Sequence, residues 1–230
     1  MNNLLMSSMY FGFVITLGAY LFGCWLKKKT KLTIMNPLLV AVVLVIIFLL
    51  GFQVDYAVYQ EGSKYVSFLL TPATVCLAIP LYKQLKLLKE NLLAVVGGIA
   101  SGVVASAISI FVFSLLFGLS HEYYVTLLPK SITTAIGMGV SEESGGIVVL
   151  TVVSIIITGI FGNVIAETIF RIFHIRNPIA RGLALGTSAH AIGTAKALEM
   201  GEVEGAMSSL AIAVAGLMTV VAVPLAAGLI

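Results

Sequence analysis

Long apolar runs separated by short polar stretches constrain the fold of this chain more than any other feature. A helix needs about 20 mostly apolar residues to cross the hydrocarbon core of a bilayer. The chain is 60% hydrophobic and 10% charged, with a mean hydropathy of +1.11, whereas soluble domains are about 45–50% apolar and about 25% charged. Lipid must therefore cover part of its surface, and we expect an all-α polytopic membrane protein. Runs long enough to span a bilayer occupy residues 4–26, 37–54, 92–117, 147–170 and 210–230.

A sixth apolar run, residues 65–82, is broken by Thr71-Pro72 and again by Pro80. Proline suits the first position of a helix and restricts the residue before it to extended backbone. Because Thr71-Pro72 lies inside the run, it predicts a half-helix that begins within the membrane at Pro72.

Two polar, glycine-containing stretches interrupt the apolar pattern, residues 127–146 (LLPKSITTAIGMGVSEESGG) and 181–205 (RGLALGTSAHAIGTAKALEMGEVEG). Aligned on Ala-Ile-Gly, they read SITTAIG ending at Gly137 and TSAHAIG ending at Gly193. Each then passes through an acidic patch into an apolar run. This likeness predicts a pair of re-entrant elements, and the alternative is a chance match between two membrane segments of simple composition.

The distribution of basic residues predicts the orientation in the membrane. Cations gather after the runs 4–26, 65–82 and 147–170, and by the positive-inside rule these loops are cytoplasmic and the N-terminus is outside. If residues 127–146 crossed the membrane once, the loop after 147–170 would fall outside and break this pattern. The charges thus favour hairpins over complete broken spans, which remain the alternative. The cations are Lys27, Lys28, Lys29, Lys31, Lys83, Lys86, Lys89, Arg171, Arg176 and Arg181.

One full span separates the two polar elements, so hairpins there would approach the midplane from opposite sides. Many secondary transporters build a central site from such an inverted-topology repeat. We therefore expect a single transmembrane domain, residues 1–230, with about six transmembrane helices plus two re-entrant or broken helical elements related as an inverted repeat. Residues 1–91 would hold the N-terminal helices, and residues 92–170 and 171–230 would each carry one polar element.

Breaks in helices at membrane depth supply the candidate site. Irregular backbone persists there only when it is buried in protein or lines a water-filled cavity, and the free amides of a half-helix N-terminus favour an anion. Hydroxyls and small residues at the three breaks suit a small carboxylate or hydroxy acid. The candidate substrate-binding residues are Pro72, Ala73, Thr74, Ser131, Thr133, Thr134, Gly137, Thr187, Ser188, His190, Gly193 and Thr194.

Ionisable groups in the two polar elements each have a functional and a structural interpretation. His190 can bind a carboxylate or relay a proton, because histidine titrates near neutral pH, or it can be a buried structural group. Glu142 can bind a coupling proton or cation, or lie with Glu143 at the outer water interface. Lys130 can neutralise an anionic substrate, but snorkelling to the outer headgroups is the favoured interpretation.

Two further charge patterns are interpreted as local structure. Lys196 lies three residues before Glu199, and Glu167 lies four residues before Arg171, which are spacings that favour ion pairs within a helix. Glu167 is therefore excluded from the site. A stripe of small residues at every fourth position of the run 92–117 is interpreted as a helix-packing surface; it consists of Gly98, Gly102 and Ser106.

The sequence lacks the motifs of competing functional classes. There is no phosphate-binding glycine loop, no H-E-x-x-H and no nucleophile elbow. The basic clusters lack the interleaved aromatic residues expected for nucleic acid. We therefore expect no enzymatic activity, no cofactor, no metal and no nucleic-acid partner.

Three stretches carry a family resemblance: residues 72–82 (PATVCLAIPLY), 128–137 (LPKSITTAIG) and 177–190 (NPIARGLALGTSAH), the last continuing to Gly193-Thr194-Ala195. With them the chain resembles, over nearly its whole length, the LrgB/CidB family of bacterial inner-membrane proteins. The resemblance implies a multi-pass protein of the cell membrane. The family is named for antiholin-like modulation of murein hydrolase activity and autolysis, together with a small holin-like partner of the LrgA/CidA type. A plant plastidal glycolate/glycerate translocator contains a similar domain, and some bacterial relatives are linked to pyruvate uptake.

The leading hypothesis is a secondary transporter of small monocarboxylates, of the pyruvate, glycolate, glycerate or lactate class, that works by alternating access. The alternative is an antiholin-like regulator of autolysis that acts through assembly with its small membrane partner. The expected partners are a small carboxylate, the lipid bilayer, the holin-like protein and further copies of this chain in a homo-oligomer.

Overall fold

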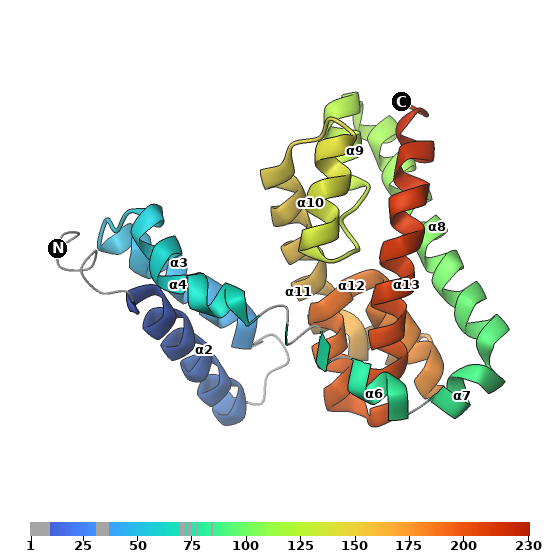
Figure 1. The fold of residues 1–230 in the computed structure, drawn as a ribbon, viewed down its shortest axis with the longest axis horizontal. Coiled ribbons are helices and arrows are strands. Elements are labelled where there is room, and N and C mark those ends of the chain that lie inside the picture. The colour runs from blue at the N-terminus through green and yellow to red at the C-terminus, as the bar shows by residue number, and fades with distance from the viewer. Residues whose placement is uncertain (1–9, 31–36, 70–71, 73–74, 77, 84) are drawn as a thin grey trace. The chain divides into compact units, whose positions relative to one another are not determined.

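The computed structural model describes residues 10–30, 37–69, 72, 75, 76, 78–83 and 85–230, and its regular secondary structure is helical (Figure 1). The prediction of an all-helical fold is thereby confirmed for these residues. The chain divides into two compact units, Met1–Cys76 and Leu77–Ile230.

The first unit contains α2 (Phe11–Thr30), α3 (Pro37–Gly51) and α4 (Tyr56–Phe68). α2 packs on both of the others. Its approach to α4 is close because glycines meet there: a Cβ on Gly62 would lie 2.5 Å from the backbone nitrogen of Gly12. One turn further along α2, Thr16 Oγ1 lies 2.7 Å from the hydroxyl of Tyr59. The contact between α2 and α4 thus combines backbone proximity with a polar side-chain bond.

The polar stretch 55–64 lies between the apolar runs 37–54 and 65–82, and in the structure most of it belongs to α4. Val58 and Gly62 are buried on one face, whereas Glu61 and Lys64 are exposed and paired with each other. The polarity of the stretch therefore reflects the exposed face of an amphipathic helix.

The second unit is a bundle in which α13 packs along α12 and also contacts α8 and α6, while α11 packs on α12 and α10 (Figure 1). Among the described residues, α8, α11 and α13 are long and apolar enough to cross a membrane. The count of six spans stays a prediction. The helices are α6 (Ala78–Lys83), α7 (Leu85–Glu90), α8 (Leu92–Phe117), α9 (His121–Leu127), α10 (Thr134–Glu143), α11 (Val148–Ile172), α12 (Pro178–Met200) and α13 (Glu202–Ala227).

The boundaries of α8 and α11 agree with the predicted spans, but α13 begins well before residue 210. Glu202 and Glu204 lie in its first turn, where the helix dipole stabilises acidic side chains. The end of the second polar element, which the sequence suggested to be part of a re-entrant segment, is therefore the start of the last long helix.

Buried apolar side chains lie on the inner faces of these helices. One cluster joins α8 to α12 and α13 and includes Ile99, Leu183 and Met207. Outward-facing positions of the same helices are also apolar, for example Leu93, which is 91% exposed. A bundle that is apolar both inside and outside is the pattern of a helical protein surrounded by lipid.

Candidate functional site

The first polar element forms a helical hairpin made of α9 and α10. At its base, the amide of Ile147 donates to Thr126 Oγ1 over 2.7 Å, and Thr151 Oγ1 donates to the carbonyl of Thr126 over 3.0 Å. His121 Nδ1 lies 2.7 Å from the backbone oxygen of Ile230. Both arms of the hairpin thus have their bases at the end of the bundle where the C-terminus lies, at the top of Figure 1. The tip between α9 and α10 points into the bundle.

The second polar element also reverses direction, because α12 folds back at His190. Its backbone there is not helical, with φ 43° and ψ −134°. Residues 185 and 193 would lie about 12 Å apart along a straight helix. Instead, a Cβ on Gly193 would overlap the carbonyl oxygen of Leu185. The two arms, residues 178–189 and 191–200, therefore lie against each other.

The second hairpin contacts the opposite end of α13 from the first. Gly182 lies against the backbone of Glu204, and Gly186 lies against the backbone of Ser208, both near the start of α13. The hydroxyl of Thr194 on the returning arm lies 2.7 Å from Ser208 Oγ. Two hairpins from opposite ends thus bring their tips toward the middle of the bundle.

A cavity of about 980 Å³ lies between α8, α11 and the first arm of α12. Most of its wall is apolar, with side chains such as Ile157 and Phe161 from α11. One end is bordered by Asn91 and Asn177, at the starts of α8 and α12. The other end is polar and is formed where α8 meets the tip of the α9–α10 hairpin.

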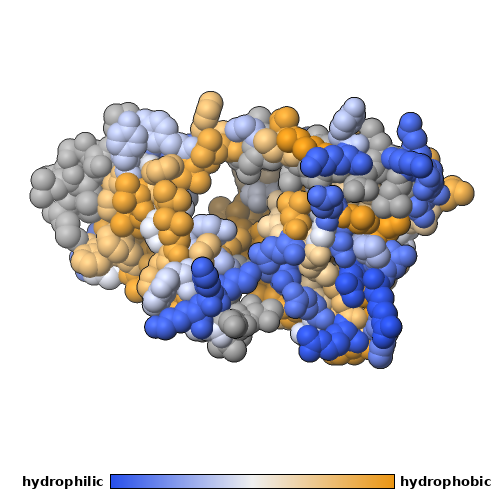
Figure 2. Space-filling model, turned by 90° about the horizontal axis from the view of Figure 1, so that it is seen from below, coloured by the Kyte–Doolittle hydropathy of each residue, from blue (hydrophilic) through white to orange (hydrophobic). Residues whose placement is uncertain are grey.

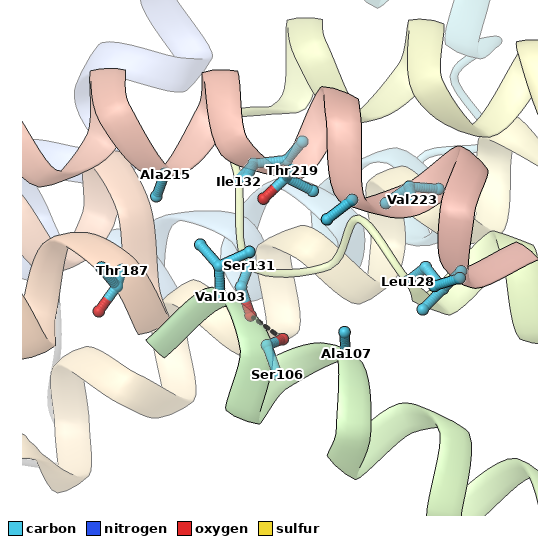
Figure 3. A pocket seen from close by; sticks show the side chains of 12 residues that line it. Val103, Ser106, Ala107, Leu128, Ser131, Ile132, Thr187, Ala215, Thr219 and Val223 are labelled. Atoms are coloured by element: carbon cyan, nitrogen blue, oxygen red, sulfur yellow. Dashed lines mark hydrogen bonds between the residues drawn. The ribbon is translucent and has the colours of Figure 1, made fainter. Parts of the chain in front are cut away.

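Lys130 is the charged group at this polar end. Its Nζ lies 3.1 Å from Ser131 Oγ and 3.4 Å from Ser106 Oγ, and the two hydroxyls are 3.2 Å apart (dashed line in Figure 3). Within the described residues, no Asp or Glu forms an ion pair with Lys130. Snorkelling of Lys130 to the outer headgroups was the favoured interpretation, and it is wrong, because the lysine stands at the hairpin tip and its ammonium bonds inward.

A second, small cavity of about 20 Å³ lies on the other side of the same serines (Figure 3). This is room for about one water molecule. Thr219 of α13 borders only the small cavity, whereas three hydroxyl side chains border both cavities: Ser106, Ser131 and Thr187. These three hydroxyl side chains therefore form the wall between a large open space and a small closed one.

Three of the predicted site residues line the large cavity, namely Ser131, Thr187 and Ser188. The hydroxyls of Thr187 and Ser188 currently donate to carbonyls one turn back, of Leu183 and Ala184, over 2.7 and 2.6 Å. Both hydroxyls can still accept a hydrogen bond.

Other predicted residues lie away from the cavity. Thr133 and Thr134 are half-buried at the start of α10, and Gly137 is buried, with Ile155 in the way of any side chain there. Glu142 is exposed near the end of α10. Pro72 belongs to the first unit and is exposed, while Ala73 and Thr74 lie outside the described residues.

His190, Gly193 and Thr194 hold the second hairpin in place. His190 is 3% exposed, and its Nε2 donates to the carbonyl of Ile155 in α11 over 3.0 Å. Thr194 bonds Ser208 of α13, and Gly193 allows the arms to touch. None of the three lines the large cavity. A role for His190 as ligand or proton relay stays a prediction.

Ser106 is a site residue that sequence reasoning assigned to packing. The packing interpretation is confirmed for the rest of its stripe, since a Cβ on Gly98 would contact Leu183 and one on Gly102 would contact Thr187, at 3.2 and 3.0 Å. The next residue of the stripe, Ser106, meets the hairpin tip instead. The sequence signal that could have identified Ser106 was its place on the same helix face as Gly98 and Gly102, the face that contacts the second polar element.

The predicted pair of Lys196 and Glu199 is confirmed, with Nζ and Oε2 3.5 Å apart. Lys196 also pairs with Glu167 of α11 over 2.5 Å, a partner on another helix that the sequence did not indicate. This ion pair ties the returning arm of the second hairpin to α11. Elsewhere in the described part of the chain, no three His, Cys, Asp or Glu side chains are grouped to hold a metal ion.

The fold and this site define a helical membrane protein with a lysine at the polar end of a large, open cavity. The profile of the LrgB-like family matches residues 16–229. The antiholin-like protein LrgB of Bacillus cereus (strain B4264) and that of Bacillus anthracis (strain A0248) are each 41% identical over 217 residues, 94% of this chain and 94% of the relative. No solved structure matches. The chain belongs to the LrgB-like family, as its motifs predicted.

Proposed function

We propose that this protein is a secondary transporter of small monocarboxylates of the pyruvate, glycolate, glycerate or lactate class. The observation that carries the proposal is the ammonium group of Lys130 at the polar end of the large cavity. A cation at membrane depth without an acidic partner is costly, and such groups serve function by default. A bound carboxylate neutralises the lysine and accepts a charge-assisted hydrogen bond from it.

The surroundings of Lys130 favour a small substrate with one negative charge. Ser106 and Ser131 offer two hydroxyls beside the ammonium, and Thr187 adds a third on the same wall. These groups suit the keto or hydroxyl oxygen next to a carboxylate. A second carboxylate would have to lie against apolar side chains of α11, which disfavours dicarboxylates.

Alternating access is supported by the two hairpins that approach from opposite ends of α13. In this proposal they form an inverted repeat within about six spans, with the N-terminus outside. The large cavity reaches from Lys130 toward the end where Arg171, Arg176 and Arg181 lie, and the positive-inside rule makes that end cytoplasmic. The described state is then open to the cytoplasm. Proton coupling at His190 or Glu142 belongs to the same proposal.

Uptake into proteoliposomes tests the proposal directly. Purified protein is reconstituted, and uptake of labelled pyruvate, glycolate, glycerate and lactate is measured under an imposed proton or sodium gradient. We expect at least one of them to accumulate above protein-free liposomes, with unlabelled monocarboxylates competing. Failure of all four under both gradients would contradict the transporter assignment.

The second candidate is an antiholin-like regulator, favoured by the names of the relatives in Bacillus. It would act in the cell membrane through a homo-oligomer or a small holin-like partner and would need no substrate. An assembly role should tolerate Lys130→Met and Ser131→Ala, which alter the inside of the cavity, in an autolysis assay at matched membrane expression. Loss of the autolysis effect in both variants would favour transport as its cause.

A further inference from the structure

A third cavity, which is polar, lies at the end of α11, away from Lys130. It measures about 570 Å³ and is lined by Arg171, His174, Arg176 and Arg181, with Phe170 and Glu167 beside them. These four basic side chains define the basic pocket. Its three arginines lie within eleven residues of the chain.

The turn that builds the basic pocket is well defined. After α11 ends, His174 adopts a left-handed conformation with φ 55°, and the amide of Ile175 donates back to the carbonyl of Phe170 over 2.8 Å. Asn177 then caps α12 by accepting from the amide of Ile179 over 2.8 Å. This short path from one helix to the next gathers the basic side chains around one space.

Arg181 is held in a fixed orientation at the pocket wall. Its Nε donates to the carbonyl of Ile175 over 2.7 Å, and its guanidinium lies 5.8 Å from the centre of the Phe170 ring. These two contacts use one N–H and one face of the group. The terminal N–H groups of Arg181 can therefore donate hydrogen bonds into the pocket.

Among the described residues, no acid pairs with Arg171 or Arg176 of the basic pocket. Glu167, the acid at its edge, pairs with Lys196. Guanidinium groups that form no ion pair match the oxygens of a phosphate, which they bind in a bidentate manner.

Exposed apolar side chains beside the arginines in the sequence favour a lipid over a free phosphate. Ile172 and Phe173 are 60% and 68% exposed, between the arginines along the chain. Figure 2, which looks at this end of the second unit, shows hydrophilic residues beside hydrophobic ones. Basic pockets at the cytoplasmic ends of membrane helices bind the headgroups of anionic phospholipids. We propose that the basic pocket binds the phosphate of an anionic lipid headgroup, with its acyl chains along Ile172 and Phe173.

Thermal unfolding in a neutral detergent tests this site without any transport assay. Wild-type protein is titrated with phosphatidylglycerol, with phosphatidylcholine of the same acyl chains, and with inorganic phosphate. We expect phosphatidylglycerol alone to raise the Tm. Native mass spectrometry of the wild type should retain phosphatidylglycerol in preference to phosphatidylcholine. Equal effects of the two lipids, or an equal effect of inorganic phosphate, would overturn a lipid-headgroup site.

A matched pair of double variants places the effect in the pocket. Arg171→Gln with Arg176→Gln removes two pocket cations, and apparent affinity for phosphatidylglycerol should fall by on the order of tenfold or more. Lys86→Gln with Lys89→Gln removes the same charge from exposed positions of α7 and should leave that affinity unchanged. Equal losses in both, or no loss in the first, would contradict the proposal. If the arginine variant does not fold, Arg176→Gln alone is compared with Lys89→Gln.

Discussion

Lys130 is the residue on which the proposed substrate binding depends most. Its ammonium lies in a mostly apolar cavity with two serine hydroxyls and no paired acid among the described residues. Such a group is stable as a cation only if an anion or water completes its shell. In the proposed function, the site would bind a carboxylate through this charge and orient it through the hydroxyls.

Lys130→Met should weaken substrate binding while keeping most of the side-chain volume. A hydrogen bond to a charged group contributes about 1.5–3 kcal/mol, so KM for the transported monocarboxylate should rise roughly 10- to 100-fold. Counterflow in proteoliposomes measures this. Lys64→Met, which removes an exposed cation from α4, is the control and should transport normally. An unchanged KM in the Lys130 variant would remove the lysine from the site.

Ser131→Ala should have a smaller effect of the same kind. One neutral hydrogen bond contributes about 1 kcal/mol, so a rise in KM of roughly fivefold is expected. Ser154→Ala is the matched control, since Ser154 bonds a carbonyl of its own helix and lies outside the cavity wall. If the two serine variants show the same KM, Ser131 does not contact substrate.

Sequence predicted the hydroxyls of this site better than its charge. Ser131, Thr187 and Ser188 could be named because hydroxyls in an apolar chain mark helix breaks. The position of Lys130 inside the bundle could not be predicted, because it depends on the length of α9 before the chain turns at the hairpin tip. In the sequence Ser106 belongs to the same packing stripe as Gly102. Only the structure shows that Ser106 contacts the hairpin tip, whereas Gly102 packs against Thr187.

The second hairpin depends on the close contact of its two arms. A Cβ on Gly193 would meet the backbone of Leu185, which cannot move aside as a side chain can. The sequence predicted a re-entrant element here with its tip within residues 187–193, and the structure places the reversal at His190. That reversal requires a backbone conformation that local propensity disfavours, so tertiary contacts must hold it.

Gly193→Ala should therefore destabilise the protein. Overpacking of this kind costs about 1–3 kcal/mol, which should lower the Tm in detergent by several degrees. Gly97→Ala in α8 is the control, because nothing lies within 4 Å of a Cβ there, and alanine suits a helix better than glycine. A Gly193→Ala protein as stable as Gly97→Ala would mean that the arms do not touch.

His190→Ala separates a positioning role from a ligand role at the hairpin tip. Losing the bond from Nε2 to Ile155 should loosen the tip against α11 and lower the maximal transport rate severalfold, whereas KM should change little because His190 does not line the cavity. Rates and KM are measured at equal amounts of reconstituted protein. A rise in KM like that of Lys130→Met would instead place the imidazole on the substrate.

At the scale of the second unit, the extents of α8 and α11 agree with the predicted runs 92–117 and 147–170, and α8 ends at Gly118, which adopts the left-handed conformation that glycine favours. The start of α13 was not foreseen, because helix-dipole stabilisation lets acidic residues continue a helix. The cavity was also beyond sequence reasoning. The cavity exists because α8 and α11 both pack against α12 but leave a space between each other.

If the protein is the transporter proposed above, the large cavity should be accessible from one side of the membrane. Ser188 lines the cavity, and Glu142 is exposed at the other end of the bundle. In a chain with Cys24 and Cys76 changed to serine, Ser188→Cys should react with a membrane-impermeant thiol reagent from the cytoplasmic side, and Glu142→Cys from the outside. Substrate should protect Ser188→Cys and leave Glu142→Cys unaffected, because only the first shares the cavity with Lys130. Labelling of both cysteines from the same side would contradict a cavity open to the cytoplasm, and with it the alternating-access mechanism built on the two hairpins.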